Sequence, residues 1–82
     1  MNEGEKQRYF QLIERRIKVR EQFERQKARV ASQQLLCDSF IVKGKKIPWL
    51  YRYNLETLTR KMYDLEGFEM YLSNEIERIE AN

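Results

Sequence analysis

The sequence contains no histidine and very little cysteine, proline or glycine. Its 82 residues include one Cys, one Pro and three Gly. Without histidine, the chain cannot form a Ser–His or Cys–His nucleophile pair and cannot offer a histidine metal ligand. It also lacks the CxxC, GxGxxG and P-loop patterns. We therefore expect no catalytic residue, no cofactor and no metal, and a protein that is not an enzyme.

Long apolar runs and paired cysteines are missing as well. No apolar stretch approaches the roughly 18 to 20 residues that a transmembrane helix needs, and Cys37, the single cysteine, cannot form an internal disulfide. These two absences favour a cytoplasmic protein in a reducing compartment, without membrane insertion. The composition that remains, 41% hydrophobic and 35% charged, is typical of a helical chain and not of a disordered or all-β one.

The net charge of +3 conceals an uneven distribution. Residues 1–39 carry nine basic and six acidic side chains, residues 40–61 carry six and one, and residues 62–82 carry one and six. The chain is therefore basic in its middle and acidic in its last quarter. A protein that binds nucleic acid along its whole surface would not need so acidic a segment.

The first half of the chain predicts a long helix over residues 3–37. This segment has no proline and many strong helix formers, such as Glu, Arg, Lys, Gln, Leu and Ala. Its apolar residues form a stripe on one face, which Arg16, Gln26 and Gln33 interrupt. The sequence thus indicates an amphipathic helix whose apolar seam is diluted by polar residues.

A second helix is predicted over residues 54–80. Its apolar residues recur at alternating steps of three and four, a period of about 3.5 residues that is typical of a coiled-coil seam. Asn54 is a suitable N-cap, although Pro48 could instead stand at the first helical position. Glu69 is the one polar member, and we expect its partner among the three polar residues of the first stripe. The members of this second stripe are Leu55, Leu58, Met62, Leu65, Glu69, Leu72, Ile76 and Ile79.

Residues 38–53 form the predicted basic turn between the helices. β-Branched and aromatic residues on both sides of a glycine-containing turn favour a short β-hairpin, with an irregular loop as the alternative. Two long helices joined by such a segment most simply fold back as an antiparallel pair. That arrangement brings Arg15 and Arg16 near Glu75 and Glu77, and such pairs disfavour a parallel one.

The expected fold is therefore all-α, a single domain over residues 1–82 in which two coiled-coil-like helices form an antiparallel hairpin. Two helices can bury only one face each, and a chain this small buries a low fraction of its surface. We therefore expect the hairpin to dimerise into a four-helix arrangement or to dock onto a larger protein.

The back of the second helix is the first candidate for a functional surface. There Tyr63, Met70 and Tyr71 surround Gly67, opposite the apolar stripe. A mid-helix glycine costs about 1 kcal/mol relative to alanine, so we interpret it as a point where another backbone approaches. The alternatives are a kink or a break of the helix at Gly67, or tyrosines that are merely tolerated at the surface. Phe23, a large apolar residue in the polar middle of the first helix, completes this set of expected protein-interaction residues.

The basic turn is the second candidate. Lys43, Lys45, Lys46 and Arg52 surround Trp49, which combines charges that bind phosphate with a ring on which a base can stack. The alternative is that Trp49 closes the end of the helical core while the lysines keep the turn soluble.

These features lead to two functional hypotheses. The first is a non-enzymatic protein–protein interaction module that binds itself or a larger protein through exposed helix faces, as an adaptor, a regulator or inhibitor, or a chaperone-like subunit. The second is a nucleic-acid-binding or transcription-associated protein that uses the basic turn. The second hypothesis alone predicts binding that weakens steeply with salt and is lost with the turn lysines.

Overall fold

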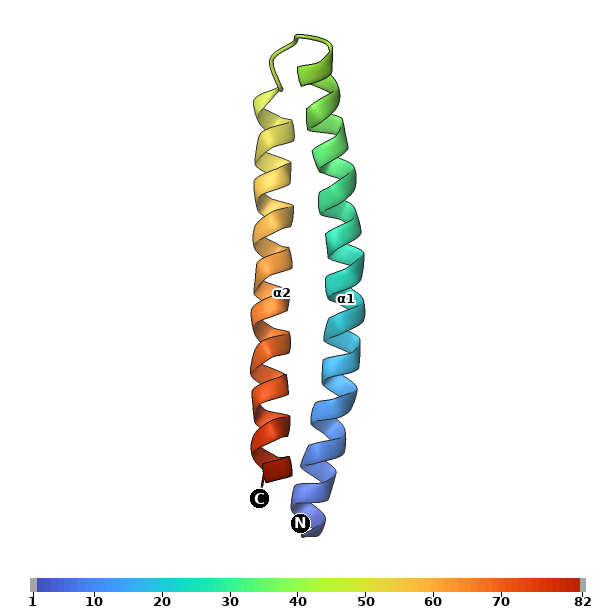
Figure 1. The fold of residues 1–82 in the computed structure, drawn as a ribbon, viewed down its shortest axis with the longest axis vertical. Coiled ribbons are helices and arrows are strands. Elements are labelled where there is room, and N and C mark those ends of the chain that lie inside the picture. Colours follow the sequence, from blue (N-terminus) through green and yellow to red (C-terminus); the bar gives the residue numbers. More distant parts are fainter. Residues whose placement is uncertain (1, 82) are drawn as a thin grey trace.

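The computed structural model describes residues 2–81, which form two antiparallel α-helices, α1 (Glu3–Val42) and α2 (Trp49–Ala81). The hairpin is a narrow rod with extents of 62 × 16 × 14 Å. Figure 1 shows α1 beginning and α2 ending at one end of the rod, with the connection between them at the other. No strand occurs among residues 2–81, so the all-α antiparallel hairpin is confirmed.

The predicted β-hairpin is wrong, because α1 continues five residues beyond Cys37. Gly44 terminates α1, because it adopts a left-handed conformation with φ of 69°. Its N–H donates to the Ile41 carbonyl at 2.9 Å, and the N–H of Lys45 donates to the Phe40 carbonyl at 2.8 Å. This pair of bonds is the Schellman motif. The β-branched residues before it are therefore helical, because the glycine cap lets the helix run up to it.

The start of α2 also differs from the prediction over residues 54–80. α2 begins at Trp49, immediately after Pro48, whose carbonyl accepts hydrogen bonds from the N–H groups of Tyr51 at 3.0 Å and Arg52 at 3.3 Å. Proline fixes its own φ near the helical value and suits the start of a helix. The connection is consequently six residues, 43–48, and not the sixteen of the predicted basic turn.

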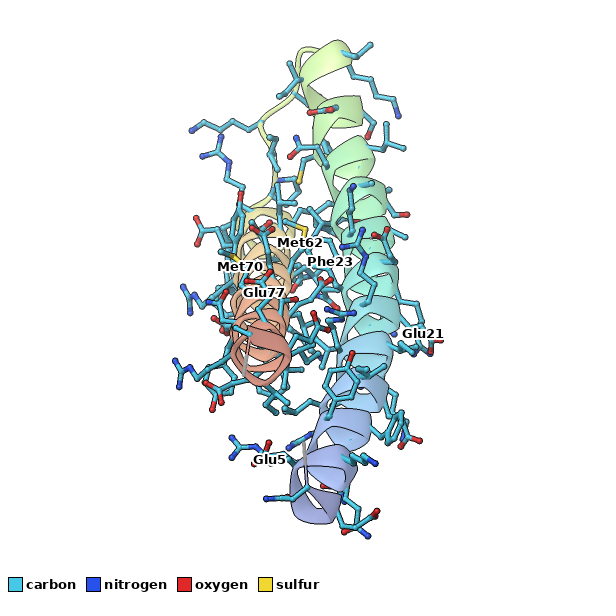
Figure 2. The ribbon with its side chains drawn as sticks, turned by 60° about the horizontal axis from the view of Figure 1, so that its bottom comes forward. Glu5, Glu21, Phe23, Met62, Met70 and Glu77 are labelled. Atoms are coloured by element: carbon cyan, nitrogen blue, oxygen red, sulfur yellow. The ribbon has the colours of Figure 1, made fainter. Side chains whose placement is uncertain are left out.

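The predicted stripe of α2 lies against α1 along the whole rod. All eight of its members are buried or half-buried, and Leu72 and Ile76 are only 1% and 2% exposed. On α1 the facing positions include Val19 and Cys37, which are also buried. Phe23 is half-buried and lies beside Met62 between the helices (Figure 2). Phe23 therefore belongs to the seam, and its assignment to an outer interaction surface is corrected.

Two polar residues of the α1 stripe, Gln26 and Gln33, form hydrogen bonds to α2 within the seam. Gln26 is 2% exposed, and its Nε2 donates to the Leu58 carbonyl of α2 at 3.0 Å. The Nε2 of Gln33 donates in the same way to the Tyr51 carbonyl at 3.1 Å. A helical carbonyl has a second lone pair free for such a bond. The glutamine side chains therefore bond to the backbone of α2, and neither is the partner of Glu69, contrary to the prediction.

Glu69 instead pairs with Arg20, whose Nη1 lies 3.0 Å from Oε1 of Glu69. At the open end of the rod, Nη2 of Arg8 lies 3.1 Å from Oε2 of Glu75. The predicted partners of Glu75 were seven and eight residues later in α1. Figure 1 shows the reason: the connection descends before α2 begins, so α2 starts below the end of α1 and meets earlier residues.

Candidate functional site

The back of α2 presents the predicted side chains to solvent. Tyr63, Met70 and Tyr71 are 61%, 60% and 55% exposed, and Figure 2 shows Met70 on the side of α2 away from α1. α2 runs unbroken through Gly67, so a helix break there is excluded. A Cβ added at Gly67 would meet no atom within 4 Å. Nothing within the hairpin therefore requires a glycine at this position.

The four predicted residues do not form one patch, because Tyr71 belongs to a different edge of the rod from Tyr63 and Met70. Tyr71 stacks on Phe68, with ring centroids 6.3 Å apart and an interplanar angle of 12°. The guanidinium of Arg15 lies 5.8 Å from the Phe68 centroid. Tyr71 thus extends toward α1 on the edge that carries the arginines.

Tyr63 and Met70 are seven residues apart in α2, and this helical spacing places them on one strip, on the other flank of α2 from Tyr71. Two further apolar residues are exposed on α1. Ile17 lines a shallow hollow with Arg20 and Glu69, the pair that bridges the helices on this side. Phe10 is seven residues earlier, on the same strip of α1, and is 62% exposed, while Ile17 is 54% exposed. We call this surface the apolar edge; its members are Phe10, Ile17, Tyr63 and Met70. The sequence pattern did not identify Phe10 and Ile17 as part of this surface, because the register of α1 against α2 decides which α1 residues lie near Tyr63 and Met70.

The arginine-bearing edge contains a hollow of about 330 Å³ at the middle of the rod. Three cationic side chains, Arg25, Arg29 and Lys61, line it together with Gln22, Gln26 and Leu65. No carboxylate is among these residues, and none of the three cations forms an ion pair within residues 2–81. The i,i+4 spacing of the two arginines was visible in the sequence, but the approach of Lys61 depends on the register.

The turn end of the rod carries the second predicted site. We call residues 39–55 the tip. Lys43, Lys45, Lys46 and Arg52 are all exposed there, and Trp49 is 76% exposed. Trp49 therefore does not close the core, which was the alternative interpretation.

A different aromatic pair closes the end of the core. Tyr51 is half-buried and packs edge-on against Phe40, with centroids 5.2 Å apart and planes at 84°. Five large apolar or aromatic side chains remain exposed at the tip, namely Ile41, Val42, Trp49, Leu50 and Tyr53. Two of these, Ile41 and Val42, were expected in a strand and became exposed because α1 extends to the turn.

Other polar side chains form hydrogen bonds within the hairpin. Cys37 is 1% exposed, and its Sγ donates to the Tyr51 carbonyl at 3.7 Å. The Tyr9 hydroxyl donates to Oε1 of Glu80 at 2.9 Å, and this bond raises the pKa of Tyr9 above its ordinary value. The carboxylate of Glu69 raises the pKa of Arg20 by hydrogen bonding and charge.

Within residues 2–81 no group of three or more His, Cys, Asp or Glu side chains is placed to hold a metal ion. Neither α1 nor α2, as the structure describes them, has a stretch apolar and long enough to cross a membrane.

Comparison of the chain with protein-family models, with curated proteins and with solved structures gave no match.

Proposed function

We propose that the protein is a non-enzymatic protein–protein interaction module that pairs with a second copy through the apolar edge, forming four helices. The observation that carries this proposal is the imbalance between buried and exposed apolar side chains. Among residues 2–81 four hydrophobic side chains are buried, whereas thirteen large ones are exposed. Four of the thirteen, Phe10, Ile17, Tyr63 and Met70, form the apolar edge. Monomeric soluble proteins rarely leave large apolar patches uncovered, so a partner over this edge accounts for these four best.

The total surface area supports the same conclusion. The chain exposes 6574 Å², whereas a compact monomer of 10.1 kDa would expose about 5,300 Å². One flank of a rod 62 Å long and 14 to 16 Å across offers about 900 Å², close to the roughly 800 Å² per partner of a standard interface. A flank-to-flank pair therefore has enough surface for a stable dimer.

Charge selects how two copies meet along this edge. On the α1 side of this edge Lys27 is exposed, and Arg20 pairs with both Glu69 of α2 and the exposed Glu24 of α1. On the α2 side Glu66 and Glu77 are exposed. Pairing α1 of one copy with α2 of the other sets Lys27 against the acidic strip of α2, whereas pairing α1 with α1 also pairs α2 with α2 and sets the two acidic strips together. The complementary pairing also brings Ile17 of each copy toward Met70 of the other.

The test is the oligomeric state in solution. Light scattering at micromolar concentration should report a dimer for the native chain and a monomer for the double variant Ile17→Glu, Met70→Glu, because two buried charges per copy would oppose association. The matched control, Gln11→Glu with Ser32→Glu, adds the same charge at exposed positions off this edge and should remain dimeric. A native chain that is monomeric and folded at these concentrations would refute self-association.

A further inference from the structure

We propose that the tip binds the surface of an anionic lipid bilayer. This inference does not depend on dimerisation, because it rests on a different part of the molecule. The apolar side chains at the tip are among the most exposed of the chain: Val42 is 86%, Trp49 76% and Ile41 61% exposed. They lie where α1 ends and α2 begins, so neither helix has a neighbour to cover them (Figure 1).

The charge of the tip matches an anionic surface. Residues 39–55 contain Lys43, Lys45, Lys46 and Arg52 and no acidic residue. The rest of the chain has 16 − 4 = 12 basic and 13 acidic residues, a net charge of −1. The whole net positive charge of the protein is therefore concentrated at one end of the rod. Basic residues near an anionic leaflet each contribute about fivefold in affinity at physiological ionic strength.

The mixture of side chains distinguishes lipid from nucleic acid. A nucleic acid would use the lysines for its phosphates and Trp49 for stacking, but it offers nothing to Ile41 and Val42. A bilayer surface uses all of them: tryptophan lies at the headgroup level, aliphatic side chains reach the acyl boundary, and lysines meet the phosphates. The tip is also the end of a rod only 14 to 16 Å across, a shape that can enter a soft interface end-on.

The single tryptophan reports on this contact directly, since Trp49 is the only Trp in the sequence. Adding vesicles of phosphatidylserine and phosphatidylcholine should shift the Trp49 emission to shorter wavelength and protect it from an aqueous quencher. Vesicles of phosphatidylcholine alone should do neither. The triple variant Lys43→Gln, Lys45→Gln, Lys46→Gln should bind about a hundredfold more weakly, as three steps of about fivefold imply.

Matched variants keep the test independent of folding and of dimerisation. The triple variant Lys6→Gln, Lys18→Gln, Lys61→Gln makes the same change of charge away from the tip and should bind vesicles within about threefold of the native chain, while the double variant Ile41→Ser, Val42→Ser should lose most of the blue shift. All five side chains are exposed, and circular dichroism should show an unchanged helix content.

Three results would overturn the proposal. The first is equal binding to both kinds of vesicle, the second is equal weakening by the two lysine triples, and the third is quenching of Trp49 by a single-stranded oligonucleotide with no response to vesicles. The monomeric variant Ile17→Glu, Met70→Glu should still bind, which separates this inference from the proposed dimer.

Discussion

Gly67 provides the sharpest test of how the back of α2 is used, because stability and association should change in opposite directions. A helix-interior glycine is about 1 kcal/mol less favourable than alanine, and a Cβ at this position has open space. Gly67→Ala should therefore stabilise the isolated hairpin by about 1 kcal/mol, which for a domain of this size raises Tm by about 4 to 8 °C. Thermal unfolding followed by circular dichroism at low concentration, where the chain is dissociated, measures this change in the stability of the hairpin.

A larger side chain at position 67 should weaken the association of two copies. Gly67 lies one helical step from Tyr63 and Met70, so we expect the partner's side chains to cover it in the dimer. Gly67→Leu should then weaken dimerisation by roughly 1 to 3 kcal/mol through overpacking, seen as a higher dissociation constant in sedimentation. Ser32→Leu, which adds the same side chain at an exposed position of α1 off the apolar edge, is the control and should not weaken it. If Gly67→Leu stabilises the monomer and leaves association unchanged, Gly67 is not at a contact.

Three further predictions concern the seam, the basic hollow and the open end of the rod. Gln26→Leu should be neutral or stabilising by up to about 1 kcal/mol in urea unfolding, because the α2 carbonyl that Gln26 contacts keeps its own helical hydrogen bond; a loss of more than that would show that the bond itself holds the helices together. Lys61→Glu should stabilise the hairpin by about 0.2 to 1 kcal/mol at low salt and by less at high salt, because it places a carboxylate between the two arginines of the hollow; equal melting curves at both salt concentrations would contradict the unpaired cluster. The raised pKa of Tyr9 implies stability that is complete below the ordinary tyrosine pKa and is lost as the pH rises through the raised value. Near-ultraviolet absorbance should show that Tyr9→Phe removes a tyrosine whose pKa lies above the ordinary tyrosine value, and the absence of any such component would mean that the bond to Glu80 does not form in solution.

The sequence was sufficient for the fold because one periodic pattern determines it. The stripe from Leu55 to Ile79 repeats about every 3.5 residues, and a stripe this narrow can be buried only along another helix. Its one polar member did find an ionic partner across the seam, although Arg20 was not among the expected candidates. The period identifies which residues face inward. It does not identify which residue of the facing helix each one meets.

The register, meaning which residue of α1 lies opposite each residue of α2, was harder to predict, because it depends on where the turn begins. The strand propensity of Phe40, Ile41 and Val42 pointed to a β-hairpin, yet these residues continue the helix that precedes them. The deciding signal was present at Gly44, which fits the glycine position of a helix C-cap. Placing the cap there would have extended α1 and shifted the expected partners of α2. The basic hollow was missed for the same reason, since Lys61 meets the arginines only in the correct register.

The charge pattern of the apolar edge also predicts how the two tips of a dimer are arranged. Two copies can face each other through a two-fold axis that runs along the rod or one that crosses it. The axis along the rod sets α1 against the partner's α2, joins basic to acidic residues and keeps Ile17 level with Met70. The crossing axis sets α1 against α1 and α2 against α2, so that the exposed carboxylates of the two α2 helices, Glu66 and Glu77, repel each other. We therefore expect both tips at the same end, where they would engage one bilayer together and gain avidity.

This arrangement can be measured with a spin label at the tip. Lys45→Cys is exposed and can be labelled, whereas Cys37 is 1% exposed and should stay unreacted in the folded protein. With the tips together, two rods 14 to 16 Å across place the labels within about 30 Å of each other. With the tips apart, the labels would be separated by nearly the rod length of 62 Å. The longer distance would contradict the charge argument even if the dimer itself forms, and the monomeric variant should give no dipolar signal.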